Sequence, residues 1–253
     1  MNKYAIVLAA GKGTRMRSQM PKVLHRVLGK PMLSRVLEAT SKAQIENQYV
    51  VIGHGSDQVE KVLDDSVKLV LQKEQLGTGH AVRTALEVLK QDVTETEGVT
   101  VLVTCGDTPL LRAESLAEMM AQHAEQKNVV TVMTTVVPNP TGYGRILQDG
   151  EQIRAIVEEK DADAEVKKIQ EINVGTYCFD LGFLIAQIDA LDTNNAQGEF
   201  YLTDLLKLAY AAGKPTPAYL LANPDESLGV NNRVQLARAE KLYRERVNEY
   251  WMM

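Results

Sequence analysis

The sequence predicts an α/β fold of the Rossmann-like type, in which helices cover a mostly parallel mixed sheet and a smaller lobe follows. Apolar runs of strand length alternate with amphipathic runs of helix length up to residue 136, which is the pattern of βαβ units. The first apolar run opens directly into a glycine-rich loop. After Pro138 the rhythm changes to shorter strand-like runs with turn residues between them, and this change indicates the second lobe.

Each element of the first lobe is expected from one run of the sequence. Strands are expected at 4–9, 49–53, 67–71, 99–105 and 129–136, and helices at 31–43, 56–63, 78–89 and 113–126. The strand runs are largely apolar without alternation, as in parallel sheets that are covered on both faces. We therefore place the first lobe at about 1–137.

The second lobe is expected at about 138–230. Asp149-Gly150 is a strong turn signal and predicts a hairpin of strands 143–147 and 152–158. A strand at 172–179, a helix at 202–211 and a strand at 216–221 are expected after it, and residues 231–253 are expected to start a polar linker helix. A crevice between the lobes, at the carboxyl ends of the parallel strands, is where a small ligand is expected to bind.

Composition narrows the class of protein. The 253 residues carry a net charge of -5, with 45% hydrophobic and 24% charged residues, which is ordinary for a globular protein. No apolar run has the length of a membrane span, so no membrane association is expected, and the acidic balance argues against a nucleic-acid partner. The two cysteines lie in apolar runs and are expected to be free thiols. The four histidines do not have the spacing of a zinc site. The expected location is the cytoplasm.

The amino-terminal segment has the composition of a polyphosphate site. Residues 1–37 hold eight of the 28 lysines and arginines and none of the 33 acids. The loop from Ala10 to Met16 reads AGKGTRM and follows the first strand directly. Glycines let the backbone approach phosphate oxygens, backbone N–H groups can cradle them, and fixed positive charge neutralises them. The alternative is an ordinary strand-to-helix turn with solvated bases.

Two common phosphate loops are excluded by spacing. A P-loop needs four residues between its first glycine and the Gly-Lys-Ser/Thr group, and Gly11-Lys12-Gly13-Thr14 does not have them. The dinucleotide fingerprint needs a third glycine at position 16, where the chain has Met16. A nicotinamide-dependent dehydrogenase is therefore disfavoured.

Asp107 is the candidate metal ligand. The apolar strand at 99–105 ends in Gly106-Asp107-Thr108-Pro109, so the carboxylate is expected to project from the carboxyl end of a buried strand. Mg²⁺ that is bound to a nucleotide takes one or two protein oxygens and otherwise phosphates and water. The alternative for Asp107 is a helix N-cap, but the basic loop at the neighbouring strand end favours the metal role.

Later segments place polar groups at strand ends and in turns. The polar segments 143–146, 157–161 and 171–175 lie at strand ends, as recognition of a hydroxyl-rich sugar requires. The segments 194–204 and 229–233 are rich in amides, and asparagines in such turns are commonly conformational. Thr203-Asp204 is expected to cap the helix that follows.

Taken together, these segments resemble the sugar-nucleotide pyrophosphorylases. LAAGKGTRM, PKVLH, LGTGHAV, GDTPL, GYGRI, IVEEKDA, EINVGTY, NNAQGEFYLTD and GVNNR occur in order from about residue 8 to residue 233. The combination of GTGHA, NNAQGE and GVNNR is similar to the N-acetylglucosamine-1-phosphate uridyltransferase half of the bacterial bifunctional enzymes that make UDP-N-acetylglucosamine. The resemblance implies a nucleotide-diphospho-sugar transferase fold, with 1–137 as the nucleotide lobe and 138–230 as the sugar lobe.

The resemblance also implies site residues. Arg15 and Lys22 are the implied catalytic residues, Arg15 on the triphosphate and Lys22 on the transferred phosphoryl group. Asp107 and Asn231 are the implied ligands of Mg²⁺. The implied substrate contacts are Leu8, Ala9, Ala10 and Gly11 at the uracil and ribose, Gln72, Gly77 and Thr78 at the base edge, and Gly144, Glu158 and Asn173 at the amino sugar. Lys22, Gly106, Asp107 and Asn231 are also implied to bind substrate.

The implied reaction joins UTP and N-acetylglucosamine 1-phosphate into UDP-N-acetylglucosamine and pyrophosphate, a step toward peptidoglycan. Cys105 departs from the family, which often has tyrosine there. The family's β-helix domain, which acetylates, is absent from the sequence, so no acetyl transfer is expected. The full-length enzymes are expected to be homotrimers and this chain alone a monomer. Two alternatives stay open: a sibling nucleotidyltransferase with another NTP or sugar 1-phosphate, and a non-catalytic sugar-nucleotide-binding module.

Overall fold

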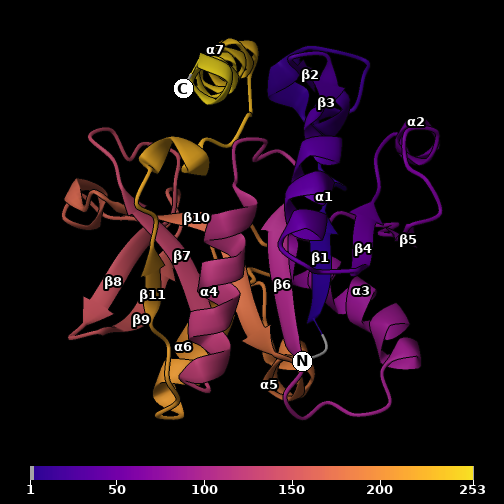
Figure 1. Ribbon diagram of the computed structural model, residues 1–253. Coiled ribbons are helices and arrows are strands. Elements are labelled where there is room, and N and C mark those ends of the chain that lie inside the picture. Colours follow the sequence, from indigo (N-terminus) through magenta and orange to yellow (C-terminus); the bar gives the residue numbers. More distant parts are fainter. Residues whose placement is uncertain (1–2, 253) are drawn as a thin grey trace.

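A nine-stranded sheet forms the centre of the computed structural model, which describes residues 3–252 (Figure 1). Its main path runs in the order β11 (Ala218–Leu220), β7 (Val130–Val136), β10 (Glu171–Asp180), β6 (Thr100–Cys105), β1 (Lys3–Leu8), β4 (Asn47–Ile52) and β5 (Val67–Leu71). The strands β6, β1, β4 and β5 are mutually parallel, and β11 is parallel to β7. The predicted α/β class with a mostly parallel mixed sheet is confirmed.

Helices cover both faces of this sheet (Figure 1). They are α1 (Met32–Lys42), α2 (Ser56–Glu60), α3 (Thr78–Asp92), α4 (Ala113–Glu125), α5 (Leu181–Gln187), α6 (Asp204–Ala211) and α7 (Arg233–Met252). Tyr4 and Ile6 of β1 pack in the cluster that contains α3, α5 and α6, whereas Ala5 packs in the cluster of α1 and α4. Alternate strand residues therefore enter opposite layers, which explains why the strands are apolar on both faces.

The strand β10 enters the sheet in a place that the sequence does not indicate. It lies between β6 and β7 and runs antiparallel to both, so these two strands are not neighbours. The strand β11 also joins the main sheet, beside β7. The lobe boundary near residue 137 stays a prediction, because strands from both sides of it belong to one continuous sheet.

The predicted hairpin forms as β8 (Arg145–Asp149) and β9 (Gln152–Val157), with Gly150 at φ 61° in the turn. It attaches to the sheet where Arg145 pairs with Ile172 of β10. A smaller hairpin of β2 (Arg26–Val27) and β3 (Lys30–Pro31) lies next to α7, although the two are far apart in the sequence (Figure 1).

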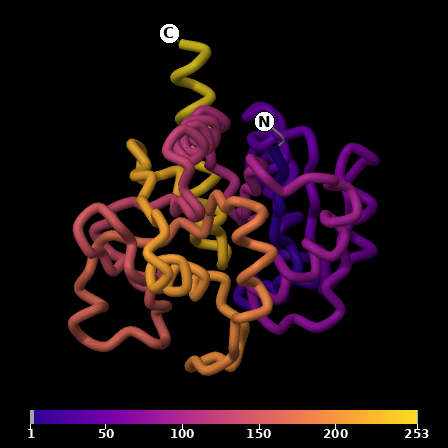
Figure 2. Tube along the Cα trace, turned by 90° about the horizontal axis from the view of Figure 1, so that it is seen from below, coloured from indigo at the N-terminus to yellow at the C-terminus, as the bar shows by residue number. Residues whose placement is uncertain are grey.

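The final helix, α7, ends at Met252 and lies within the segment 231–253 that was expected to start a linker helix; Met253 lies outside the described residues. The guanidinium of Arg35 on α1 lies 3.8 Å from the centre of the Tyr243 ring and holds α7 against α1. Seen from below, the end of α7 projects away from the rest of the chain (Figure 2). None of the helices over residues 3–252 has both the length and the apolar character that a membrane span needs.

Candidate active site

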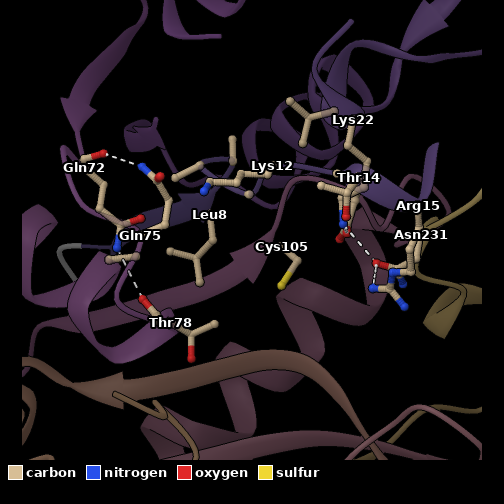
Figure 3. Close-up of a pocket in the computed structure, with 18 of the residues that line it drawn as sticks. Leu8, Lys12, Thr14, Arg15, Lys22, Gln72, Gln75, Thr78, Cys105 and Asn231 are labelled. Atoms are coloured by element: carbon tan, nitrogen blue, oxygen red, sulfur yellow. Dashed lines mark hydrogen bonds and ion pairs between the residues drawn. The ribbon is translucent and has the colours of Figure 1, made fainter. Parts of the chain in front are cut away.

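A cleft of about 510 Å³ lies at the carboxyl ends of β1 and β6 (Figure 3). The topology explains its position, because β1 and β6 are parallel neighbours and Leu8 is paired with Cys105 where both strands end. Many of the predicted substrate and catalytic residues line it: Leu8, Ala9, Ala10, Gly11, Arg15, Lys22, Gln72, Gly77, Thr78, Asp107 and Asn231. The structure thus brings together four separate segments of the chain, at 8–22, 72–78, 107 and 231.

The glycine loop forms one rim of the cleft. Gly13 has φ 60°, and a Cβ atom on it would lie 2.6 Å from the Cβ of Lys22. Only glycine fits at this position, because the loop turns back against the segment that carries Lys22. The loop then forms the short helix η1 (Thr14–Met16), in which Met16 is buried while Arg15 stays exposed. The burial of Met16 anchors the turn and leaves the charged side chain free for a ligand.

Two cations and two oxygen-bearing side chains meet at the far end of the cleft. The ammonium of Lys22 forms an ion pair with the Asp107 carboxylate and donates to Oδ1 of Asn231 at 3.0 Å. Nη2 of Arg15 donates to the same Asn231 oxygen at 2.9 Å, as Figure 3 shows. The side chains of Lys22 and Asp107 are only about one-sixth exposed. Asn231 therefore connects the glycine loop to the candidate metal carboxylate.

The backbone around Asn231 explains how a residue so late in the chain reaches this place. The N–H of Val230 donates to the carbonyl of Asp107 at 2.9 Å. The N–H of Asn231 donates to Oε1 of Gln235 in the first turn of α7, at 2.8 Å. Nε of Arg233 donates to the carbonyl of Met16 at 3.0 Å. The start of α7 is thus fixed against both the glycine loop and the end of β6.

Asp107 does not cap a helix. The next helix, α4, begins at Ala113 with Arg112 as its N-cap, and the Asp107 side chain is paired with Lys22 instead. The N-cap alternative for this residue is therefore excluded. Gly106 lies beneath the cleft rather than in its lining: its N–H donates to Leu8 at 2.9 Å, and a Cβ would lie 3.0 Å from a Leu33 methyl group.

The other end of the cleft carries amides. Gln72 is buried, and its Nε2 lies 3.3 Å from the carbonyl of Gly77 and 2.9 Å from Nδ1 of His80. Nε2 of Gln75 donates to the Gln72 carbonyl at 3.0 Å (Figure 3). Gly77 has φ 111°, and a Cβ there would lie 2.6 Å from the carbonyl oxygen of Phe200. The turn that precedes α3 is therefore packed tightly against the segment at 199–202.

Several lining residues were not predicted: Lys12, Gly13, Thr14, Val23, Gln75, Ala81, Cys105 and Glu199. Lys12 to Thr14 lie inside the predicted loop, so their signal was present and unused. Gln75 shares the turn of Gln72 and could have been found in the same way. Glu199 comes from a distant loop, and nothing in its local sequence indicates that this loop packs on the turn before α3.

Gly144, Glu158 and Asn173 do not line the cleft but meet one another beside it. A Cβ on Gly144 would lie 3.4 Å from Oε2 of Glu158 and 3.5 Å from Cβ of Asn173, and the Asn173 N–H donates to the Gly144 carbonyl at 2.9 Å. Cys105 lines the cleft, and its Sγ lies 3.8 Å from the carbonyl of Gly175, whose N–H donates to Oδ1 of Asn173 at 2.9 Å. The two sets of predicted contacts are thus adjacent.

Burial controls ionisation on this side. Burial raises the pKa of Glu158, and a hydrogen bond from the Thr203 hydroxyl at 3.3 Å opposes the rise. Burial also raises the pKa of the Cys105 thiol to about 12, so this thiol is neutral at physiological pH. The expectation that Thr203 caps α6 was wrong: it occupies the N-cap position without a side-chain cap, because its hydroxyl is turned toward Glu158.

Comparison with known proteins decides the family. The MobA-like NTP transferase domain matches residues 5–171. The chain belongs to this family. It is 49% identical over 254 residues to the bifunctional protein GlmU of Lactococcus lactis subsp. cremoris strain MG1363, and 48% identical to that of Exiguobacterium sibiricum. All of the chain is aligned in both cases, but with only 54% and 55% of the relatives, so it spans about half of their length.

The fold of this NTP transferase domain recurs in a crystal structure of UDP-glucose pyrophosphorylase complexed with UDP-glucose. The TM-score is 0.77 at 19% identity, over 97% of this chain and 100% of the other. The apo form of UDP-glucose pyrophosphorylase gives the same TM-score at 18% identity. At this level of identity the likeness shows the fold.

Nucleotidyltransferases of this kind generally use a divalent metal ion. Within residues 3–252 no three His, Cys, Asp or Glu side chains gather into a metal site. The Asp107 carboxylate and the Asn231 amide oxygen do converge on a single cation, the Lys22 ammonium. Two hard oxygen donors around one positive charge fit a nucleotide-bound divalent ion, which takes its other ligands from phosphates and water.

Proposed function

We propose that the chain transfers the uridylyl group of UTP to N-acetylglucosamine 1-phosphate and releases pyrophosphate. One observation carries the proposal: Arg15, Lys22, Asp107 and Asn231 come from three separate segments and meet at the glycine loop. The name and the identity of the GlmU relatives support the choice of this activity within the family. The proposed product is UDP-N-acetylglucosamine.

The nucleotide is proposed to lie along the cleft. The triphosphate would take the end where the glycine loop and Arg15 supply backbone N–H groups and positive charge. The base would take the end with Gln72, Gly77 and Thr78, where amide and backbone groups offer both donors and acceptors. Gln75 joins this set, because its side chain lines the same end and is held by the Gln72 carbonyl. Leu8 to Gly11 would line the uracil and ribose between the two ends.

The amino sugar is proposed to lie beside the cleft, on Gly144, Glu158 and Asn173. The absence of a side chain at Gly144 keeps this space open, since a Cβ there would clash with a methyl group of Ile156 at 2.8 Å and would lie against Glu158 and Asn173. Cys105 lines the cleft on the side of this group. A sugar 1-phosphate in this position directs its phosphate toward Lys22 and Asp107.

Mg²⁺ is the proposed ion, with Asp107 and Asn231 as its protein ligands. When bound, it supplies positive charge to phosphate oxygens as charge builds up on them. Lys22 would then be released from Asp107 and could neutralise the transferred phosphoryl group, which is the role proposed for it.

The chemistry asks for positioning rather than proton transfer. An oxygen of the sugar 1-phosphate, already an anion, attacks the α-phosphorus of UTP; the new P–O bond forms as the bond to the β-phosphate oxygen breaks, and pyrophosphate leaves with that electron pair. No side chain needs to accept a proton. Arg15 and Lys22 hold two mutually repelling anions together and absorb developing negative charge, which is the main contribution of such sites.

A matrix of substrates tests the proposal. The purified chain is incubated with UTP, CTP, dTTP or GTP and with N-acetylglucosamine 1-phosphate or glucose 1-phosphate in Mg²⁺, and pyrophosphate release is measured. We expect the highest kcat/KM for UTP with N-acetylglucosamine 1-phosphate. A higher value for another pair would assign the chain to a sibling activity, and no release with any pair would refute nucleotidyl transfer.

A further inference from the structure

One buried arginine lies where the three strands that carry the proposed sugar contacts meet. Arg145 of β8 is paired with Val157 of β9 on one side and with Ile172 of β10 on the other. Gly144 precedes Arg145, Glu158 follows Val157, and Asn173 follows Ile172. Each proposed sugar contact is therefore the direct chain neighbour of Arg145 or of one of its two partners.

The arginine and the sugar contacts lie on opposite faces of this part of the sheet. Successive side chains in a strand point to opposite faces, and paired residues share a face. The proximity of Gly144 to Glu158 and Asn173 shows the sugar face. Arg145 contacts Glu159, the residue after Glu158, on the reverse face. Arg145 therefore lies behind the proposed sugar contacts, on the opposite face of the sheet.

The contacts of Arg145 tie a turn to the end of a strand. Its Nη2 forms an ion pair with Oε2 of Glu159 at 2.7 Å, and its Nη1 donates to the carbonyl of Tyr143. The same Glu159 oxygen accepts from the Gly142 N–H at 3.0 Å. One ion pair therefore holds both backbone groups of the turn before β8 against the end of β9.

The pair is poorly suited to a purely stabilising role. Arg145 is only 1% exposed, and its Nε is buried without a hydrogen-bond partner among the described residues. Removing an arginine from water is costly, and apolar residues of similar volume often stabilise a fold as well or better. What an apolar side chain cannot do is direct hydrogen bonds to the turn and to the strand end.

We propose that the Arg145–Glu159 pair is a positioning clamp that sets the spacing of Gly144, Glu158 and Asn173 and so controls binding of the sugar 1-phosphate. The inference rests on the proposed function and deepens it at the sugar subsite. Neither residue of the clamp needs to touch the substrate. A misplacement of 1 Å among groups that position a substrate can cost about a hundredfold in rate. The nucleotide end of the cleft is built from other segments, so loss of the clamp is expected to leave binding of UTP unchanged.

Substitutions of the clamp test this separation. Glu159→Ala removes the acceptor of both Arg145 and Gly142, and Glu159→Gln keeps an oxygen acceptor without the charge. We expect Glu159→Ala to raise KM for N-acetylglucosamine 1-phosphate about tenfold or more, with KM for UTP within about twofold of wild type. Glu159→Gln should fall between these values. The matched control is Glu165→Gln, because Glu165 forms an exposed ion pair with Lys168 in the same predicted lobe; it should change neither KM.

The clamp is refuted if both KM values rise equally or if neither changes, including the case in which only the melting temperature falls. Arg145→Lys, which keeps the charge but loses the forked donors, should follow Glu159→Ala. Calorimetric titration of each variant with N-acetylglucosamine 1-phosphate and with UTP gives the same comparison without turnover. If the wild-type chain shows no turnover, the proposed function is refuted. If the wild-type chain is active and the variants lose affinity for both substrates equally, only the clamp is refuted.

Discussion

Lys22 is predicted to compete with a divalent ion for the same oxygens. Its ammonium contacts Asp107 and Asn231. The side chains of Lys22 and Asp107, the two charged residues, are largely shielded from solvent. Two unit charges at contact distance near a protein surface attract by about 4 kcal/mol. If hydration of the released ammonium offsets about half of this attraction, displacing Lys22 from Asp107 costs about 2 kcal/mol. This cost corresponds to a roughly thirtyfold loss of metal affinity.

Lys22→Met removes this competitor. We expect the variant to bind Mn²⁺ roughly thirtyfold more tightly than wild type in the absence of nucleotide, measured by electron paramagnetic resonance of the free ion. The same variant should lose turnover, because it also lacks the proposed phosphoryl contact. Lys12→Met is the matched control: it removes an equal charge from the same cleft, but no contact joins Lys12 to Asp107 among the described residues. An affinity no higher in Lys22→Met than in wild type, or an equal gain in Lys12→Met, would refute the reasoning.

Three further predictions follow from the same geometry. Arg15→Ala should lower kcat by about a hundred- to a thousandfold, since it removes a charge contact made in the transition state, and leave the circular-dichroism melting curve unchanged because Arg15 is exposed; near-normal kcat would contradict its role. Gly13→Ala should lower the free energy of unfolding by about 1–2 kcal/mol, because residue 13 has a positive φ and the added Cβ would clash with Lys22. Gly11→Ala should leave it unchanged, because a Cβ at residue 11 meets open space. Equal urea midpoints for the two variants would count against the loop geometry. Glu158→Gln should stabilise the fold at pH 8, because the raised pKa of Glu158 means that the native state binds its proton more tightly than the unfolded state and loses stability as pH rises above the usual glutamate range. The gain in melting temperature should shrink at pH 4, where Glu158 is protonated in the native state. A larger gain at pH 4 than at pH 8 would contradict the assignment.

Much of the fold could be predicted because local signals and tertiary packing agree. The strand and helix runs up to residue 136 appear close to their expected bounds, and Asp149-Gly150 turns the hairpin as expected. The position of β10 could not be predicted. Its apolar sequence fits any buried strand, and its insertion between β6 and β7 depends on long-range pairing that no local pattern records.

The candidate site divides in the same way. The glycine loop and Asp107 were predictable because a composition bias and a strand end lie in single segments of the chain. Asn231 was expected only from the family resemblance, since its place depends on backbone contacts of Val230 and Arg233 with distant segments. Thr203 was misread because a threonine before a helix normally caps it, and only the fold shows Glu158 within reach of its hydroxyl.

A crystal structure with UDP-N-acetylglucosamine and Mn²⁺, phased to show the anomalous signal of the ion, tests the central claim most directly. The account predicts the ion between the Asp107 carboxylate and the Asn231 oxygen, with Lys22 released onto a phosphate, the uracil toward Gln72 and the acetamido sugar against Glu158 and Asn173. An ion elsewhere, with the Lys22–Asp107 pair intact while the product is bound, would contradict it.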